Sequence, residues 1–545
     1  MATPYRDLLD KIRLAFPQPV SDPIHDSYFV HSIMRALDQV DEMKMGLPVL
    51  GSVIPDDYEA ARSAKLHPHI SSIEEVTSNL VSYLQGMTIF SHPYTQQNVV
   101  PPPSIPSLIG VLLSSLYNAN IAWDEYSRRV SLAEVEAIAI TAQLLGYDPC
   151  QAGGVFTFGG TGTTLYGVKI GLEKACPHTM RDGVSSDAIV FVSDAGHYCA
   201  YNVTSWLGIG TSRLHTIPTT AENEIDINCL EQEARTALSS GKKIAAFIAT
   251  LGTTDAFGLD DLQRITVLRD TLVDEFQLSY RPHIHADAVI GWAWAVFNDY
   301  DFEDNPLEFR PRTIRALAGA SRRIRYLNLA DSIGVDFHKT GFTPYISSAF
   351  IVKNKKDLHL VTRPQEQMPY LYHFGEHRPG MLTLETSRAG TGPLAALANL
   401  RLLGQEGLRV IIGHIVEMAQ LLREHLEGHE AITVLNRDNF GTVNIFRTYP
   451  LGVDTFAIKE QEFGDPTYRT SLLKHNEYNR KVFHYVHAEA MAGRSVVLSQ
   501  TECYRKTQYN EPITAIKSFI LSPFVDTKDV EIVVNKILEA RENIS

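Results

Sequence analysis

Apolar runs that end in polar residues recur through the middle of the chain. Residues 187–202, 242–258 and 281–291 each begin as an apolar, strand-like run and finish in a polar loop. Segments of helical length separate these runs, for example from Asp260 to Glu275. Apolar strands that alternate with helices predict an α/β fold with a mostly parallel, doubly wound sheet. Ligands bind beyond the carboxyl ends of such strands, so we expect the polar residues there to form a site.

The two ends of the chain follow other patterns. Residues 1–120 read as helices joined by proline-rich turns, and residues 92–104 contain consecutive prolines that favour an extended chain. From Thr391 the periodicity is helical, and strand-like runs follow at residues 431–435, 443–446, 495–499 and 515–521. We therefore predict three parts: an N-terminal helical and proline-rich segment (1–120), a large domain (121–395) and a small C-terminal α+β domain (396–545).

Composition narrows the class of protein. The 545 residues carry a formal net charge of −14, which disfavours nucleic acids and anionic membranes as partners. The five cysteines are scattered without a C-x-x-C pair, so neither a zinc site nor a disulfide framework is predicted. The longest apolar run, residues 105–116, is broken by Pro106 and Gly110 and is not expected to span a bilayer. Because the N-terminus also lacks the apolar core of a signal peptide, we expect a soluble, cytoplasmic protein.

A glycine-rich turn, residues 159–162, separates a strand-like run from a helix that begins near Thr163. Glycines let the backbone approach an anion closely, and the unpaired N–H groups of a helix's first turn point towards it. The turn is not a P-loop, and the dinucleotide-binding fingerprint is incomplete because no third glycine has the required spacing. The turn is therefore either a phosphate cradle or an ordinary structural turn.

Four side chains capable of chemistry follow predicted strands. His197, Thr254 and Asp287 lie at the ends of the three apolar runs, and Lys339 lies in a polar turn within residues 330–352. Each alone has an ordinary explanation, although a buried carboxylate needs a partner and a lysine in a pocket shifts its pKa readily. Jointly, an anion cradle, a ring platform, a carboxylate and a lysine describe a site for pyridoxal 5'-phosphate (PLP).

A second hypothesis places a metal ion on one of these strands. His283, His285 and Asp287 alternate in the sequence, so their side chains share one face and form a plausible metal cluster for a metal-dependent hydrolase. This hypothesis leaves the glycine turn and Lys339 without a role. A third hypothesis, a non-catalytic scaffold of the same fold, conflicts with the presence of all the expected cofactor residues.

The order of motifs GGT, His197, LGTT, HADA and DSIGVDFHK resembles the group II PLP-dependent amino acid decarboxylases. This is the family of glutamate, aromatic amino acid and tyrosine decarboxylases, and the resemblance covers most of the chain from about residue 92 onward. It implies the fold-type I, aminotransferase-like architecture, with a mostly parallel seven-stranded sheet in the large domain. It also implies a homodimer with active sites at the subunit interface, acting on a small-molecule amino acid. The expected reaction is decarboxylation of an L-amino acid to the amine and carbon dioxide.

The resemblance also implies a role for individual residues. Lys339 matches the lysine that binds the cofactor covalently, Asp287 the carboxylate that pairs with the pyridine N–H, and His197 the residue stacked on the ring. Further matches are Gly160 and Thr161 at the phosphate, His338 on the phosphate's other side, Thr254 as a support for the aspartate, and Arg388 near the partner subunit's phosphate site.

The stretch of about 28 residues after Val352 has no clean periodicity and is predicted to be a functional lid. Within it Tyr370, which stands 370 − 339 = 31 residues after Lys339, resembles the loop tyrosine that returns a proton to the substrate; Tyr372 is a competing candidate. A tyrosine there favours simple decarboxylation over the alternatives, which are another PLP-dependent carbon–carbon lyase or an aldehyde-forming oxidative decarboxylase.

The chain departs from the family pattern at two positions. Val289 stands where many relatives have alanine, and Phe337 where many have proline. These differences leave the substrate and the final product, amine or aldehyde, open. The element from Thr340 to Tyr345 resembles the tyrosine decarboxylases, so an aromatic substrate such as tyrosine is favoured and an acidic one is possible.

Overall fold

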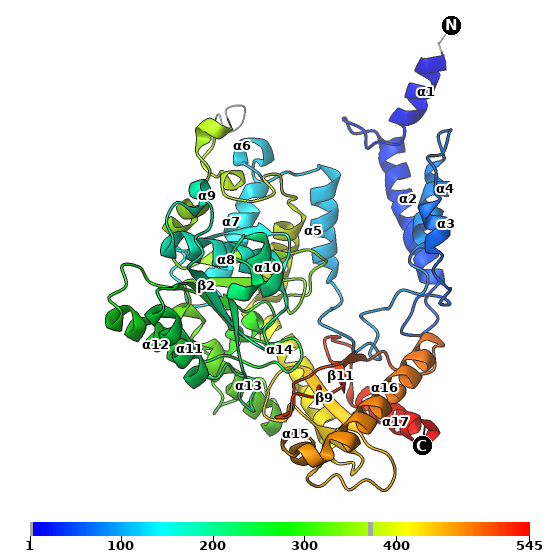
Figure 1. Cartoon of the computed structure of the whole chain (residues 1–545). Coiled ribbons are helices and arrows are strands. Elements are labelled where there is room, and N and C mark those ends of the chain that lie inside the picture. The colour runs from blue at the N-terminus through cyan, green and yellow to red at the C-terminus, as the bar shows by residue number, and fades with distance from the viewer. Residues whose placement is uncertain (1–3, 369–373, 545) are drawn as a thin grey trace.

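The chain folds around one large and one small β-sheet, as Figure 1 shows for the computed structural model, which describes residues 4–368 and 374–544. The large sheet has seven strands in the order β1-β7-β6-β5-β4-β2-β3. β7 is antiparallel to both of its neighbours, and the remaining pairs are parallel. The predicted α/β fold with a mostly parallel sheet is therefore confirmed. The strands are β1 (Gly153–Thr157), β2 (Ala188–Ser193), β3 (Leu214–Ile217), β4 (Lys243–Thr250), β5 (His283–Asp287), β6 (Ser332–Asp336) and β7 (Ser348–Val352).

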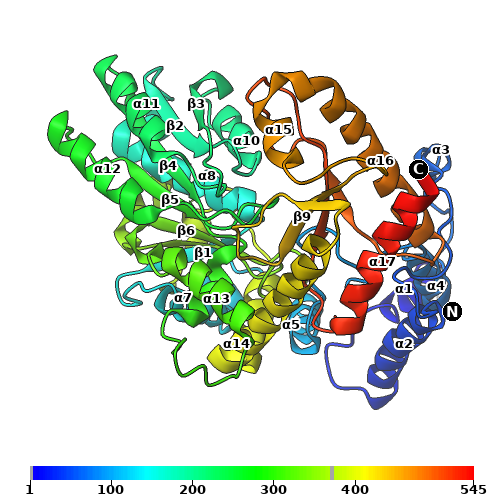
Figure 2. The same ribbon diagram turned by 90° about the horizontal axis from the view of Figure 1, so that it is seen from below.

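Helices cover the large sheet because its central strands are buried along their length, on both faces. The covering helices include α7 (Val130–Leu144), α8 (Gly160–Ala175), α9 (Thr179–Asp182), α10 (Cys199–Trp206), α11 (Ile227–Ser239), α12 (Leu262–Glu275) and α13 (Pro311–Ile324). α14 (Thr391–Glu427) begins where the helical periodicity predicts, and its backbone breaks from helical geometry at Gly404, where φ is 56°. The helix continues to the small sheet and so connects the two sheets (Figure 2).

The small sheet has the order β10-β11-β9-β8 and is antiparallel throughout. Its strands are β8 (Ile432–Val434), β9 (Val443–Thr448), β10 (Ser499–Thr501) and β11 (Ala515–Phe519), and its helices are α15 (Ile458–Gly464), α16 (Arg469–Met491) and α17 (Thr527–Ile544). The strand predicted at 495–499 is displaced, because Val497 forms a bridge to Thr95 and pairing within the sheet starts only at Ser499. The proposed domain limits at residues 120 and 395 stay predictions.

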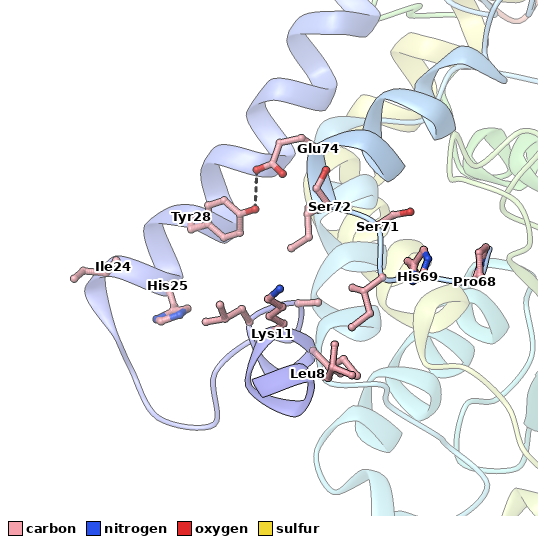
Figure 3. Close-up of a pocket in the computed structure, with 15 residues that line it drawn as sticks. Leu8, Lys11, Ile24, His25, Tyr28, Pro68, His69, Ser71, Ser72 and Glu74 are labelled. Carbon is pink, nitrogen blue, oxygen red and sulfur yellow. Dashed lines mark hydrogen bonds between the residues drawn. The ribbon is translucent and has the colours of Figure 1, made fainter. Parts of the chain in front are cut away.

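The N-terminal segment stands beside the main body, as the blue helices of Figure 1 show. It contains α1 (Pro4–Arg13), α2 (Pro23–Glu42), α3 (Tyr58–Arg62) and α4 (Ile73–Ser82), and none of the residues in these four described helices is buried. A cavity of about 910 Å³ opens between α1, α2 and residues 68–74 (Figure 3). One hydrogen bond across it joins the hydroxyl of Tyr28 to Glu74 at 2.8 Å. We call α1 to α4 the arm.

Shorter elements complete the chain. α5 (Ile105–Leu116) and α6 (Asp124–Ser127) lead from the arm into the large sheet. Residues 92–104 form neither helix nor strand, but turns at 93–94 and 98–99 interrupt the extended chain that the prolines predict. The predicted lid contains the 3₁₀ helices η4 (Lys355–Val361), η5 (Gln365–Gln367) and η6 (Pro379–Met381); the others are η1 (Thr211–Arg213), η2 (Gly291–Phe297), η3 (Leu327–Leu329) and η7 (Pro466–Tyr468). Across residues 4–368 and 374–544, no helix combines the length and apolarity that crossing a membrane requires.

Candidate active site

Lys339 lies in the loop that follows β6, beside an aspartate on the same strand. Its Nζ is 3.0 Å from Oδ2 of Asp336, and the side chains are 17% and 1% exposed. The hydroxyl of Ser348 donates to Oδ1 of Asp336 at 2.5 Å, which fixes the carboxylate. Burial alone would lower the pKa of Lys339, but the carboxylates of Asp336 and Asp287 outweigh it and raise that pKa. The lysine is therefore held as an ammonium ion.

Asp287 ends β5, the strand next to β6, and is buried. Within the described part of the chain its Oδ1 has no hydrogen-bond partner. Burial raises the pKa of Asp287 to about 6, although the nearby ammonium of Lys339 opposes this shift. A buried carboxylate with an unsatisfied oxygen is costly, so the position suits a ligand that brings a positively charged N–H group.

The glycine turn forms the start of α8. Gly159 precedes the helix with φ of 112°, a conformation that side chains rarely allow, and Gly160 and Thr161 begin the first turn. A Cβ atom at Gly160 would lie 2.9 Å from Oδ2 of Asp336 and 3.1 Å from Cγ1 of Val289. The helix N-terminus, with its unpaired N–H groups, therefore lies directly beside the Asp336–Lys339 pair, at a place suited to a phosphate group. Val289 is packed against this turn.

His197 and Thr254 line the same cavity as Lys339, with a volume of about 650 Å³. The Nδ1 atom of His197 accepts a hydrogen bond from the backbone N–H of Cys199 at 3.1 Å, which sets the ring's orientation in the loop after β2. Burial, and then the ammonium of Lys339, lower the pKa of His197, so the ring is neutral. Thr254 follows β4, and its neighbour Thr253 closes the loop by accepting from the N–H of Gly258.

His338, the residue before Lys339, is buried. Its Nδ1 lies 3.0 Å from the carbonyl oxygen of Ser347, and its Nε2 lies 3.6 Å from Oδ2 of Asp336. Burial lowers the pKa of His338, although Asp336 opposes the shift. The ring packs against Tyr345 with centroids 4.1 Å apart. Tyr345 lines both the Lys339 cavity and a second cavity, of about 370 Å³, that contains Arg388.

Arg388 is held inside its own subunit by several bonds. It pairs with Glu134 through both terminal nitrogens and donates to the carbonyl oxygens of Phe156 and Ile121, each at 3.0 Å. Burial would raise the pKa of Glu134, but Arg388 and His377 lower it to about 2. The guanidinium therefore neutralises a fully buried carboxylate beside the second cavity.

Two candidate residues cannot be placed. Tyr370 and Tyr372 lie outside the described residues, so the proposed loop acid has no geometry here. The flanking residues are ordered against the main body, since Glu376 and His377 donate backbone N–H bonds to Asp124.

The metal hypothesis is wrong. Among the described residues no group of three His, Cys, Asp or Glu side chains is arranged to hold a metal ion. His283 and His285 instead share one partner, because Nε2 of the first and Nδ1 of the second both lie 2.8 Å from the hydroxyl of Ser332. The alternation in the sequence reflects packing against α8, where Gly167 and Gly171 leave room for the two rings.

Several residues of the site are not predicted by the sequence. Asp336 is the first residue of the D-F-H-K element, and Ser348 lies on another strand. Lys517, on β11, reaches the cavity from the small sheet and pairs with Asp255 at 2.8 Å. A lysine inside an otherwise apolar strand, AIKSF, is the one signal that could have revealed it. From the proline-rich stretch, Asn98, Val99 and Val100 line the cavity.

The donor set fits PLP. Lys339 offers an amine, the unsatisfied Oδ1 of Asp287 offers an acceptor for a ring N–H, and the start of α8 offers N–H groups to a phosphate. Asp287 ends β5, Lys339 follows the neighbouring strand β6, and the start of α8 follows β1. Lys339 lines one cavity with His197 and Thr254. The carboxylate of Asp336 is an exception, because its negative charge lies beside the start of α8, where it would repel a phosphate group.

Comparisons with known proteins agree with this chemistry. The family model described as "Pyridoxal-dependent decarboxylase conserved domain" matches residues 55–448. The L-2,4-diaminobutyrate decarboxylase of Acinetobacter baumannii is 27% identical over 379 residues, 66% of this chain and 68% of that relative. The L-tyrosine decarboxylase of Enterococcus faecium is 27% identical over 350 residues, 61% of this chain and 55% of that relative. The matches thus span about half to two thirds of the relatives' own length.

Solved structures share the fold over the whole chain. The crystal structure of TDC from Oryza sativa with PLP and tryptamine has a TM-score of 0.76 at 17% identity, and covers 97% of this chain and 99% of that one. At this identity the likeness concerns the fold alone. It confirms the fold-type I architecture that the sequence motifs predict.

Proposed function

The chain belongs to the family of pyridoxal-dependent decarboxylases and is a PLP-dependent amino acid decarboxylase, and on that premise we propose roles for its residues. Lys339 binds the cofactor covalently, Asp287 pairs with its ring nitrogen, and the start of α8 holds its phosphate. The observation that carries this proposal is the presence of one unsatisfied buried carboxylate, Asp287, and one half-buried lysine, Lys339, after the ends of adjacent strands.

When bound, PLP supplies an electron-accepting ring for the electrons that the departing carboxylate leaves behind. Asp287 keeps a proton on the ring nitrogen and stabilises charge that develops there, because it is fixed and shielded from water. His197, which lines the cavity with Lys339, would lie against the ring face and exclude water from it. Lys339 must lose one proton before its nitrogen can form a covalent bond, and Asp336 opposes that loss.

The loop tyrosine completes the reaction in this proposal. Tyr370 donates a proton to Cα after carbon dioxide leaves, with Tyr372 as the competing candidate. Replacing Tyr370 by Phe removes the acid and keeps the ring, so the product should shift from amine towards aldehyde, with consumption of dioxygen. Tyr372→Phe is the matched control. Unchanged amine output from Tyr370→Phe together with aldehyde from Tyr372→Phe would transfer the role to Tyr372.

The lining of the cavity favours a polar aromatic substrate such as tyrosine. Tyr198, Tyr345 and Tyr504 supply aromatic walls, and Val99 supplies an apolar one. A second candidate is a diamino acid, because Asp194 and Asp255 also line the cavity and a carboxylate is the natural partner for a second ammonium group. Asp255 is already paired with Lys517, which weakens that candidate.

A homodimer would explain the unusual burial of α5, whose small residues are buried and whose large apolar residues are exposed. α5 buries the small residues Ser107, Gly110 and Ser114, while its large apolar residues face outward. A Cβ at Gly110 would lie 2.9 Å from the carbonyl oxygen of Leu394, so the small face is fitted to α14. The exposed set is Ile105 (73%), Leu108 (47%), Ile109 (48%), Leu112 (43%), Leu113 (52%) and Tyr117 (81%). Such a patch on a soluble surface supports contact with a second subunit, as does the unburied arm.

The function is tested by supplying PLP to the purified protein and measuring carbon dioxide release from a panel of L-amino acids. The panel includes tyrosine, tryptophan, glutamate, aspartate and 2,4-diaminobutyrate. We expect release from an aromatic amino acid with formation of its amine. Release from 2,4-diaminobutyrate alone would favour the second candidate, and no release from any member would contradict the proposal.

A further inference from the structure

A continuous chain of buried hydrogen bonds runs from the protein surface to the strand that carries Asp287. Nζ of Lys174 lies 3.3 Å from Nδ1 of His283. The hydroxyl of Ser332 lies 2.8 Å from Nε2 of His283 and 2.8 Å from Nδ1 of His285. The two rings and the serine are 0% exposed, whereas the side chain of Lys174 is 23% exposed and also pairs with Asp357. We call these four residues the histidine relay.

The fold reserves space for the relay. A Cβ atom at Gly167 would lie 2.5 Å from Nδ1 of His285, and one at Gly171 would lie 2.9 Å from Cβ of His283. The two glycines are one helical turn apart, so they form a smooth strip of α8 that faces β5. Any larger residue at either position would displace a histidine. The rings are therefore fixed by packing as well as by hydrogen bonds.

The chemistry of Lys174 fixes the direction of every proton in the relay. An ammonium group only donates, so Nδ1 of His283 must accept and its proton must reside on Nε2. That Nε2–H donates to Ser332, whose own hydroxyl then donates to Nδ1 of His285. The proton of His285 must accordingly reside on Nε2. Burial lowers the pKa of both histidines to about 3, in agreement with two neutral rings.

The free end of the relay lies beside Gly334, the residue that is paired with Asp287 across the sheet. Nε2 of His285 is 3.6 Å from the position that a Cβ of residue 334 would occupy. Gly334 is the register partner of Asp287 across β6 and β5, and neighbouring strands are about 5 Å apart. His285 and Asp287 also share one face of their strand. Within the described chain, Nε2 of His285 and Oδ1 of Asp287 are both buried without a partner.

We propose that Lys174, His283, Ser332 and His285 are positioning residues that direct an N–H donor at the carboxylate of Asp287, directly or through one water molecule, and so favour its charged form. The proposal rests on the proposed role of Asp287 at the cofactor ring. A carboxylate that accepts a hydrogen bond is stabilised as an anion, and the anion is the form that can hold a proton on the ring nitrogen.

Other groups near both ends of the relay bear on its effect. Lys339 and Asp336 act on Asp287 in opposite directions, and the thiol of Cys199 is close enough for Asp287 to raise its pKa. Asp331 lies 3.9 Å from Nδ1 of His283 and is paired with Arg269. The hydroxyl of Thr163 is a competing acceptor for the Nε2–H of His285, because a Cβ at Gly334 would be close to both groups. The same hydroxyl donates to the carbonyl oxygen of Gly160.

The first test reads the tautomers directly and needs no cofactor. The full-length protein is labelled with ¹⁵N-histidine, and His283→Asn and His285→Asn variants assign the two rings by NMR. We expect both rings to carry their proton on Nε2 and to remain neutral from pH 6 to pH 9. A proton on Nδ1 of either ring, or a charged ring, would overturn the proposal. Failure of PLP to bind would leave this result untouched and would count against the proposed function instead.

The second test asks whether the relay reaches Asp287. Ser332→Ala interrupts the relay in the middle, and Ser332→Thr restores a hydroxyl. Binding of PLP is titrated against pH by absorbance in the cofactor-free Lys339→Ala background, so that the ionisation of Lys339 does not contribute. In Ser332→Ala the pH at which binding is half-maximal on the acid side should rise by about one pH unit, because Asp287 loses a donor. Ser332→Thr should return it towards the parent value.

The control removes a buried hydroxyl elsewhere. Thr141→Val deletes a hydroxyl that donates to the carbonyl oxygen of Ala137 at 2.6 Å within α7. It should leave the half-maximal pH unchanged. An unchanged value in Ser332→Ala, or an equal shift in Thr141→Val, would reduce the relay to a structural hydrogen-bond network.

Discussion

The ammonium nitrogen of Lys339 lies 3.0 Å from Oδ2 of Asp336, three residues earlier in the chain. The same oxygen would lie 2.9 Å from a Cβ at Gly160, at the start of α8. Asp336 therefore sits between the lysine that we propose as the cofactor's attachment point and the turn that we propose as its phosphate site. One carboxylate both keeps Lys339 protonated and repels an incoming phosphate.

Asp336→Asn should make cofactor attachment easier. The amide keeps the shape of the carboxylate but removes the charge that raises the pKa of Lys339, so the uncharged amine becomes available at lower pH. We expect the pH for half-maximal attachment to fall by about 1 to 3 units, measured by absorbance titration of the cofactor-free protein. Asp255→Asn is the matched control, because it removes an equal charge from the wall of the cavity that Lys339 lines, where Asp255 pairs with Lys517. An equal shift in both variants would contradict the role of Asp336.

Asp287→Asn should stabilise the cofactor-free protein while it abolishes most activity. The folded pKa of about 6 is raised above the unfolded value, so burial of Asp287 favours its protonated form. The carboxylate therefore costs stability once the pH exceeds about 6, and this cost shrinks as the pH falls towards 4. Urea unfolding should show the variant more stable by about 2 kcal/mol at pH 7 and by less at pH 5. A variant that is less stable at pH 7 would contradict the assignment of an unsatisfied buried carboxylate.

The same substitution should lower kcat by roughly 10²- to 10³-fold, because a fixed charge at the ring is lost. Steady-state kinetics with a saturating substrate provide the measurement. In the cofactor-free parent protein, binding of PLP should weaken as the pH drops through about 6, when Asp287 takes up a proton.

Arg388→Leu should destabilise the fold strongly. The substitution leaves Glu134 buried without its main partner, a situation that typically costs about 3 to 5 kcal/mol. The folded pKa of Glu134, about 2, lies below its unfolded value, so the pair stabilises the protein above about pH 4.5 and loses this effect as the pH falls towards 2. The gap between parent and variant should narrow over that range in denaturant unfolding.

Two comparisons separate this effect from ordinary surface charge. Arg401→Leu removes an exposed ion pair with Glu136 and should cost less than about 1 kcal/mol. Adding Glu134→Gln to Arg388→Leu should recover part of the loss. Equal costs for Arg388→Leu and Arg401→Leu would show that the buried pair does not carry the stability that we assign to it.

Leu112→Asp combined with Leu113→Asp should separate the proposed dimer. Both leucines are about half exposed on α5, and two charges in an apolar contact are costly to bury. Analytical ultracentrifugation should show a dimer for the parent and a monomer for the double variant. The control is Leu451→Asp, which changes a leucine that is 69% exposed in a turn after β9. This variant should remain dimeric. A monomeric parent would contradict the proposal outright.

The sequence predicts those features of the fold and of the site that depend on the order of strands along the chain. Alternating apolar strands and helices predicted the parallel sheet, and the residues at the strand ends, from His197 to Lys339, border one edge of it. The four-residue edge strand β3 and the exact start of β10 escaped, because short edge strands carry too few residues for a pattern.

Partners that are distant in the sequence could not be predicted. Glu134 lies 254 residues from Arg388, and Lys517 lies 262 residues from Asp255. A charge pattern does not say which of many carboxylates a cation meets after folding. The inverted burial of α5 was hidden for a related reason, since a helix with apolar residues outward reads in sequence like one that packs them inward.

The attachment of PLP to Lys339 is the central claim, and chemical reduction tests it most directly. The protein is loaded with PLP, treated with borohydride to fix the covalent bond, digested, and mapped by mass spectrometry. We predict loss of the bound cofactor's absorption band on reduction, and a pyridoxyl group on Lys339 alone. Lys339→Ala should show neither. A reduced adduct on another lysine, or a Lys339→Ala variant that shows the parent's absorption band and loses it on reduction, would contradict the account.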